Sequence, residues 1–268
     1  MQQKKIDGKG KGAYMEDMEV IYLGHSGFLL KWQHCDWLFD YYEGTLPRGD
    51  GQKPLFVFVS HKHQDHFNPE IFSIQGYREI HYILSHDTKR QVQKLFPAVP
   101  VHFLRAGESL GLPVTGTDAG LKIRTLRSTD CGVAFLVTWQ GKTIYHAGDL
   151  NWWVWKGESK QYNNNMTANF LKYTEPLKGQ ELFAAFLPLD PRQEEWYSKG
   201  MLHILETARV SYAFPMHFWK DFSVIGRFLD SPERKPYQSI VVRLTKEGQR
   251  ICCRQAGDQT DSHSCTDD

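Results

Sequence analysis

The sequence predicts a mixed α/β (α+β) fold in which several strands end in chemically active residues. Short apolar, β-branched and aromatic runs alternate with helical patterns between residues 55 and 104. Three of the apolar runs in the chain lead within a few residues to His61, Asp149 and His217. Loops that leave strand ends are where metal-binding and catalytic groups usually collect, so the same pattern that predicts the fold also predicts a site.

The first part of the chain predicts a set of strands joined by short turns. A stretch without periodicity over residues 1–16 is expected to be a flexible leader. Residues 41–53 contain three Gly and one Pro and should form a loop. We expect strands over residues 18–23, 27–32, 35–40 and 55–59.

The rest of the chain predicts a helix–strand alternation, followed by a second sheet of antiparallel character. A tight turn at Gln140-Gly141 should join two of its strands. Residues 255–268 are polar and unpatterned, which predicts a disordered tail. The expected helices start near residue 69 and span 87–95, 164–173, 196–210 and 221–229. The expected strands span 79–84, 101–104, 121–126, 132–139, 142–145, 183–187, 213–216, 239–244 and 250–254.

The most informative stretch is Ser60-His61-Lys62-His63-Gln64-Asp65-His66-Phe67, which follows the buried strand predicted over 55–59. His61 and His63 can converge on one ion as neutral imidazoles, and Asp65 and His66 can turn toward a second. The alternative is a polar surface loop. Three histidines within six positions after a core strand favour metal binding.

The segment His-Lys-His-Gln-Asp-His resembles the H-x-H-x-D-H signature of the metallo-β-lactamase superfamily. Three further segments agree with that family in order, at residues 24–28, 145–149 and 214–219. The resemblance spans about residues 17–254. Within the superfamily, the sequence is similar to the branch of L-ascorbate-6-phosphate lactonase-like hydrolases. It implies a single domain over 17–254, folded as a four-layered αββα sandwich with the metal loops at one edge between two sheets.

The resemblance also implies a two-metal site. Its first metal would be held by His61 and His63, and its second by Asp65, His66 and His217, with Asp149 as the bridge. Nitrogen-rich ligation suits zinc, up to two ions, with manganese or iron as alternatives. Water activated between two cations would be the nucleophile, and Asp65 would orient it and move protons.

One departure from the family pattern affects the first metal. Most members have a further histidine after the strand that precedes the bridging aspartate. Here the region from Thr125 to Asp130 contains none, and Ser128 or Asp130 falls closest to the expected place. His146 is the nearby histidine and is a candidate ligand or supporting residue. The first site is therefore expected to be weaker than the second.

Three further features keep two interpretations each. His25, in the turn after the first strand, is either an active-site neighbour or a histidine satisfied by backbone hydrogen bonds. Asp40 is either an acceptor for the N–H of a metal-bound histidine or a turn residue. Trp152, Trp153 and Trp155 either line a substrate mouth or anchor the following helix on the core.

Composition limits the classes of partner. The 268 residues include 32 basic and 31 acidic side chains, for a net charge of +1. This balance offers no basic surface for nucleic acid or an anionic membrane, so we expect a small-molecule substrate and neither of those partners. No apolar run reaches the roughly 18 residues of a membrane span. Nothing in the sequence predicts the oligomeric state.

The N-terminus and the cysteines favour a cytoplasmic protein. Residues 1–5 are basic, but no apolar stretch follows them, which argues against a signal peptide. The odd number of cysteines, without a framework spacing, suits a reducing compartment better than a disulfide scaffold. The five cysteines are Cys35, Cys131, Cys252, Cys253 and Cys265.

Three functions compete on these observations. The leading hypothesis is a metal-dependent hydrolase acting on a small-molecule ester, lactone or phosphate ester. A nuclease or phosphodiesterase is disfavoured by the neutral charge. A non-catalytic metal-binding module with a degenerate first site is the alternative from a different class, and it is motivated by the missing histidine. An oxygen reductase of the same fold is disfavoured because His63 stands where those proteins have a carboxylate.

Overall fold

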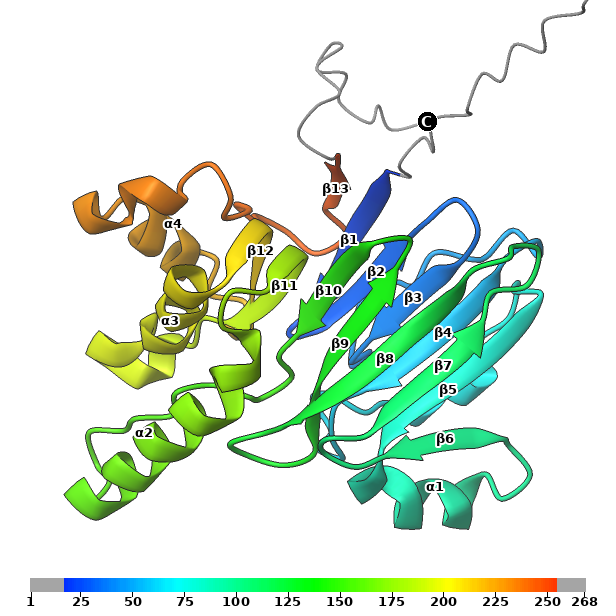
Figure 1. Cartoon of the computed structure of the whole chain (residues 1–268), viewed down its shortest axis with the longest axis horizontal. Coiled ribbons are helices and arrows are strands. Elements are labelled where there is room, and N and C mark those ends of the chain that lie inside the picture. Colours follow the sequence, from blue (N-terminus) through cyan, green and yellow to red (C-terminus); the bar gives the residue numbers. More distant parts are fainter. Residues whose placement is uncertain (1–16, 255–268) are drawn as a thin grey trace, which may run out of the picture.

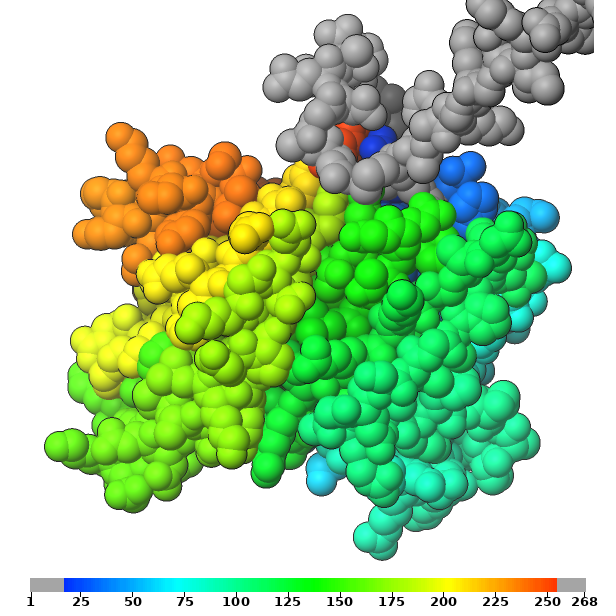
Figure 2. Space-filling view, in the orientation of Figure 1, coloured from blue at the N-terminus to red at the C-terminus, as the bar shows by residue number. Residues whose placement is uncertain are grey.

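A computed structural model describes residues 17–254, which form two β-sheets with a shared core between them and helices at their outer sides (Figure 1). The predicted leader (1–16) and tail (255–268) lie outside the described residues. The mixed α/β sandwich predicted from the sequence is confirmed. Figure 2 shows the same side of the molecule, with the segment of β8 to β10 in green beside the helical flank in yellow and orange.

The first sheet has seven strands in the order β13-β1-β2-β3-β4-β5-β6. Pairing is antiparallel from β13 to β3 and parallel from β3 to β6. The parallel part matches the helix–strand alternation seen in the sequence. The strands are β1 Met18–Gly24, β2 Gly27–Lys31, β3 Asp36–Phe39, β4 Pro54–Val59, β5 Glu79–Ser85, β6 Val101–Leu104 and β13 Arg250–Cys253.

The second sheet has six strands in the order β12-β11-β10-β9-β8-β7. It is antiparallel from β7 to β10, as predicted, but β10, β11 and β12 pair in parallel. Parallel neighbours need a long crossover, and helices provide it here. The strands are β7 Ser109–Pro113, β8 Gly120–Arg127, β9 Val133–Trp139, β10 Lys142–His146, β11 Glu181–Pro188 and β12 Arg209–Met216.

The helices flank the sheets. The N-cap of α2 is Ser159, whose hydroxyl accepts from the Tyr162 backbone at 3.1 Å, so this helix begins before the predicted residue 164. The α-helices are α1 Lys89–Leu95, α2 Lys160–Thr174, α3 Lys199–Thr207 and α4 Ser223–Leu229. The 3₁₀ turns are η1 Pro69–Ser73, η2 His86–Thr88, η3 Glu175–Leu177, η4 Pro191–Trp196 and η5 Pro232–Tyr237.

The structure differs from the sequence-based assignments at three places. The helix predicted over 196–210 ends at Thr207, because the chain enters β12 at Arg209. The strand predicted over 239–244 is reduced to an isolated bridge between Ala213 and Val241. Strand β7 was not predicted, since Gly111 and Pro113 weaken its strand pattern.

Strand β4 explains how the first metal motif is held. All six of its residues are buried, because both of its faces are covered. Phe56 and Phe58 join the core between the sheets, while Leu55, Val57 and Val59 join a second cluster on the other face. The motif therefore begins from one of the least exposed strands of the protein.

Two further sequence-based expectations can be compared with the described residues. Cys131 and Cys253 are free thiols, whereas Cys252 is disulfide-bonded, which departs from the expectation of reduced cysteines. Within residues 17–254, no helix has both the length and the apolar character needed to cross a bilayer.

Candidate metal centre

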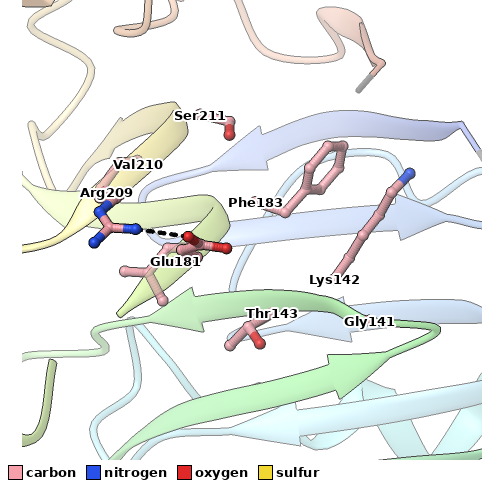
Figure 3. Close-up of a pocket in the computed structure, with 9 residues that line it drawn as sticks. Gly141, Lys142, Thr143, Glu181, Phe183, Arg209, Val210 and Ser211 are labelled. Carbon is pink, nitrogen blue, oxygen red and sulfur yellow. Dashed lines mark hydrogen bonds and ion pairs between the residues drawn. The ribbon is translucent and has the colours of Figure 1, made fainter. Parts of the chain in front are cut away.

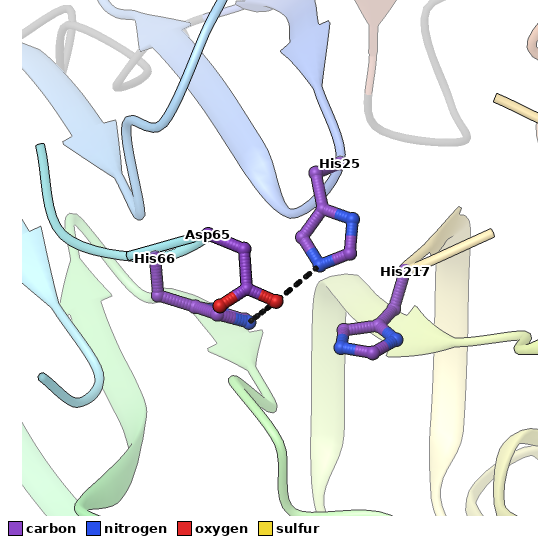
Figure 4. Close-up of side chains that lie close together, drawn as sticks. All are labelled: His25, Asp65, His66 and His217. Atoms are coloured by element: carbon purple, nitrogen blue, oxygen red, sulfur yellow. Dashed lines mark ion pairs between the residues drawn. The ribbon is translucent and has the colours of Figure 1, made fainter. Parts of the chain in front are cut away.

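Ligand-type side chains gather in two neighbouring clusters at one end of the two sheets. Within each cluster, one ligand atom from every residue lies within 4.8 Å of the others. The inner cluster, shown in Figure 4, consists of His25, Asp65, His66 and His217. The outer cluster consists of His61, His63, Asp130 and Asp149.

Three strand-end loops meet at the outer cluster. The loop after β4 carries His61, and its Ser60 carbonyl accepts a 2.9 Å hydrogen bond from Val133, which follows the loop after β8. Gly148, at φ +50°, leaves room for Ser60, because a Cβ at this position would lie 2.6 Å from the Ser60 Cβ. These close backbone contacts bring Asp130 and Asp149 beside the histidine motif.

His66 is held from behind by Asp40. Its Nδ1 lies 2.8 Å from Asp40 Oδ2, and both side chains are fully buried. Asp40 also accepts hydrogen bonds from the Ser60 backbone at 2.7 Å and from its hydroxyl at 2.6 Å. One carboxylate thus orients the His66 ring and anchors the start of the metal loop.

His217 has an equivalent partner that the sequence analysis missed. Its Nδ1 lies 3.0 Å from Asp190 Oδ2, and Asp190 in turn accepts from Arg192 Nε at 2.9 Å. Asp190 is fully buried just beyond the end of β11. The signal for it was the same strand-then-loop context that identified Asp149.

The unpaired atoms of these side chains fit a bound cation. The buried atoms His66 Nε2 and Asp149 Oδ1 lie 3.2 Å apart but form no hydrogen bond among the described residues. A buried polar atom without a partner is costly, and a cation bound by these two atoms would satisfy both. An imidazole that is bonded to a carboxylate through Nδ1 and leaves Nε2 free is also the usual form of a metal-binding histidine.

The charges of the site are strongly coupled. Burial acts to lower the pKa of His217, but the Asp149 and Asp190 carboxylates outweigh it and raise that pKa to about 9. Burial opposes the charged form of Asp149, yet His66 and His217 hold its pKa well below the usual range. Burial lowers the pKa of His61, which favours the neutral imidazole that a cation needs.

Ser128, Asp130 and His146, the three residues that could replace the absent histidine ligand of the first metal, differ in their contacts. Asp130 Oδ2 lies 3.4 Å from His63 Nδ1, within the outer cluster. Ser128 instead accepts a 3.1 Å hydrogen bond from the Asp130 backbone and shapes the turn. His146 lies outside both clusters, because Gly148 donates to its Nδ1 at 3.2 Å and its Nε2 faces the Ser26 carbonyl at 3.0 Å.

The family model of the β-lactamase superfamily domain matches residues 19–163, more than half of the chain. The chain belongs to the metallo-β-lactamase superfamily. A UPF0173 metal-dependent hydrolase from Desulforamulus reducens is 30% identical over 150 residues, which cover 49% of this chain and 62% of that protein. The match thus spans less than two thirds of the relative.

Solved structures of this superfamily fold show the same architecture. Igni18, a metallo hydrolase from Ignicoccus hospitalis, superposes with a TM-score of 0.60 at 15% identity, covering 89% of this chain and 99% of its own. CmlA, a diiron β-hydroxylase from Streptomyces venezuelae, superposes with a TM-score of 0.55 at 11% identity, covering 91% of this chain and 55% of its own. At these identities the likeness establishes the fold alone.

A cavity of about 390 Å³ opens onto both clusters of this superfamily site. Trp153 and Trp155 line it and stack in parallel, with ring centroids 5.8 Å apart, whereas Trp152 packs against Phe170. The two interpretations of the tryptophans therefore apply to different residues. The lining residues are His63, Asp65, Thr129, Asp130, Asp149, Trp153, Trp155, Tyr162, Met166, Arg192, His217 and Trp219.

A second cavity, of about 300 Å³, lies at the opposite end of the second sheet (Figure 3). Its charged lining residues include Glu181 and Arg209, which pair at 2.7 Å. No histidine or cysteine is among its lining residues. Substitutions in this cavity can therefore serve as controls, because it is remote from the inner and outer clusters.

Proposed function

We propose that this metallo-β-lactamase superfamily protein is a metal-dependent hydrolase of a small-molecule ester, lactone or phosphate ester. The observation that carries the proposal is the position of Asp149 between the two clusters. Its Oδ2 lies 3.5 Å from His61 Nε2, and its Oδ1 lies 3.2 Å from His66 Nε2 and 3.4 Å from His217 Nε2. One carboxylate thus presents a separate oxygen to each cluster, an arrangement that suits a bridging ligand.

The proposed ligands follow from this geometry. His61, His63 and Asp130 would hold an outer cation, and Asp65, His66 and His217 an inner one, with Asp149 shared. His25, the fourth member of the inner cluster, would orient Asp65 rather than bind the ion. Bound cations would lower the pKa of water toward neutrality and polarise the substrate oxygen under attack. We propose zinc on the basis of the imidazole-rich set, with manganese or iron as alternatives. The diiron centre of CmlA shows that the same fold carries iron in another protein.

Asp65 is proposed as the catalytic carboxylate. It lines the cavity and keeps a quarter of its side chain exposed, so it can face both the metals and the substrate. Its Oδ2 lies 3.4 Å from His25 Nε2, which helps to fix its orientation. Burial favours the protonated carboxyl, but His25 and His66 outweigh it and lower the pKa of Asp65. An ionised carboxylate there can accept the proton of an attacking water.

The non-catalytic alternative loses its main motivation. It rested on an incomplete first site, whereas Asp130 lies within 3.4 Å of His63 and offers a carboxylate in that place. The resemblance of the sequence motifs to the lactonase-like branch makes lactones one substrate group to test. The cavity of about 390 Å³ suits small molecules.

Metal analysis and a substrate panel test the proposal. Protein purified without added metal would be analysed by mass spectrometry and then assayed on esters, lactones and phosphate esters. We expect the protein to hydrolyse at least one of these classes. A chelator should abolish the hydrolysis, and added metal should restore it. Asp65→Asn should lower the rate of hydrolysis at least about 100-fold. A protein that carries both metals and turns over none of the three classes would contradict the proposed function.

A further inference from the structure

Exposed aromatic side chains concentrate at the mouth of the metal-facing cavity. The exposed large hydrophobic residues of the described chain are Leu95, Tyr162, Leu171 and Trp219. Two of these four, Tyr162 at 39% and Trp219 at 45% exposure, line the same cavity. A core-anchoring role, the commoner fate of aromatic residues, does not account for side chains that remain this exposed.

Trp219 is held in place by a strained loop. His217, Trp219 and Lys220 all have left-handed backbone angles, with φ of 62°, 50° and 64°. Non-glycine residues adopt such angles only where the surroundings enforce them, and they cluster at functional sites. The His217 backbone donates to the His25 carbonyl at 3.1 Å, and the Lys220 ammonium pairs with Glu43 at 3.0 Å. These contacts hold the loop that places the Trp219 indole beside the His25 ring, with the ring centroids 4.5 Å apart.

A second aromatic surface extends outward from the inner cluster. The Trp153 ring lies 5.3 Å from His217, and its Nε1 donates to the Asp149 carbonyl at 2.9 Å. Trp155 continues this surface, parallel to Trp153 within 1°. The two stacked indoles thus run from buried Trp153, beside the proposed metal ligands, to half-buried Trp155.

Arg192 connects the two aromatic surfaces. Its guanidinium lies 4.7 Å from the Trp219 ring and 5.9 Å from the Trp155 ring. Asp190 holds the guanidinium through Nε and Nη2. Because the planar cation is fixed by a buried carboxylate and lies near both indoles, the mouth is lined with rigid, flat π-surfaces rather than adaptable aliphatic side chains.

We propose that the cavity selects substrates with a planar aromatic ring next to the bond to be hydrolysed. The ring would stack against the surface formed by Trp155, Arg192 and Trp219, while the scissile group faces the two clusters. The inference rests on the proposed function, because it assumes that reaction occurs beside Asp149. One stacked aromatic pair favours a planar ring over a saturated ring of equal size by roughly two- to tenfold.

A pair of matched carboxylates tests the selectivity without requiring turnover. Benzoate and cyclohexanecarboxylate have the same charge and nearly the same size, but only benzoate is planar. Their binding to the zinc-loaded protein would be measured by calorimetry, with metal content determined on the same sample. We expect benzoate to bind roughly two- to tenfold more tightly, and 2-naphthoate to bind more tightly still.

Substitutions localise the effect. Trp219→Leu and Trp155→Leu should each abolish the benzoate preference, so that the two acids bind equally, while cyclohexanecarboxylate affinity and metal content stay unchanged. Trp219→Phe should restore the preference, since it keeps an aromatic face. Leu95→Ala, at an exposed position outside this cavity, is the control and should behave as the unmodified protein does. Trp155→Leu decides the question if Trp219→Leu does not fold.

The outcomes distinguish the two proposals. Equal binding of the two acids by zinc-loaded protein overturns the aromatic selectivity and leaves the hydrolase proposal standing. The same conclusion follows if neither acid binds. A preference that survives both leucine variants also overturns it. Protein that cannot be loaded with metal at all contradicts the proposed function instead.

Discussion

The inner and outer clusters use similar side chains but differ in how these are supported. His25, His66 and His217 of the inner cluster are at most 3% exposed. The buried carboxylates of Asp40 and Asp190 orient two of these rings. In the outer cluster, the side chains of His63 and Asp130 are 44% and 39% exposed. The residue types of the ligands would not reveal this difference in burial and support.

The hydrogen-bonded support of each ligand, as well as its chemical identity, should set the metal affinity of the two clusters. A ring already fixed by a buried partner loses little conformational freedom when it binds an ion, whereas an exposed side chain must be ordered at that moment. The outer cluster has one comparable support, the 2.9 Å contact between Ser60 Oγ and His61 Nδ1. We therefore expect the inner cation to be held more tightly, and the following experiments test that expectation.

The largest effect should come from removing inner ligands. We expect His66→Ala and His217→Ala each to lower the metal affinity of the inner site by more than about 100-fold. Loss of a residue that only supports a ligand costs up to about 100-fold, and loss of the ligand itself should cost more. Both should abolish the tighter of two binding phases in a zinc titration. His203→Ala, a histidine of α3 outside both clusters, is the matched control. Unchanged metal content in both variants would show that the inner assignment is wrong.

The next largest effect should come from the buried supports. Asp190→Asn and Asp40→Asn keep the size of the side chain but remove the charge that orients His217 and His66. We expect each to weaken the tighter phase by roughly 10- to 100-fold. Glu181→Gln, in the remote cavity of Figure 3, removes a surface carboxylate and should leave both phases unchanged. An inner affinity that is indifferent to both aspartates would remove the basis of the comparison.

A smaller effect is expected at the outer cluster. Asp130→Ala should weaken only the looser phase, by about tenfold, because His61, His63 and Asp149 remain. Competition with a chromophoric zinc chelator would resolve the two phases. Two equally tight phases in the unmodified protein would show that exposure of His63 and Asp130 does not limit affinity.

The smallest effect separates Ser128 from Asp130. Since Asp130 contacts His63 and Ser128 supports the turn, Asp130→His should retain or strengthen the looser phase by up to about tenfold, as imidazole suits zinc. Ser128→His should weaken it, because the hydroxyl that accepts from the Asp130 backbone is lost. If Ser128→His bound the second zinc ion more tightly than Asp130→His, position 128 would correspond to the absent histidine ligand.

The sequence by itself determined the elements whose signal is local. The uninterrupted apolar run of β4 predicted a strand buried on both faces, and the spacing of His61, His63, Asp65 and His66 placed four polar groups on one loop. Gln140-Gly141 predicted a tight turn, which the positive φ of both residues confirms. Such features need only neighbouring residues, so periodicity and turn chemistry suffice to predict them.

Tertiary structure decided everything that depends on which strand ends meet. Asp40, Asp130 and Asp190 follow β3, β8 and β11, and each sequence position suited a turn residue equally well. Sheet pairing and the packing of one sheet on the other brought them to the histidines: Asp40 to His66, Asp130 to His63 and Asp190 to His217. The same packing split the tryptophans, with Trp152 against Phe170 and Trp155 at the cavity. Contacts between residues far apart in the chain depend on the register and layering of whole sheets, which a local sequence pattern does not encode.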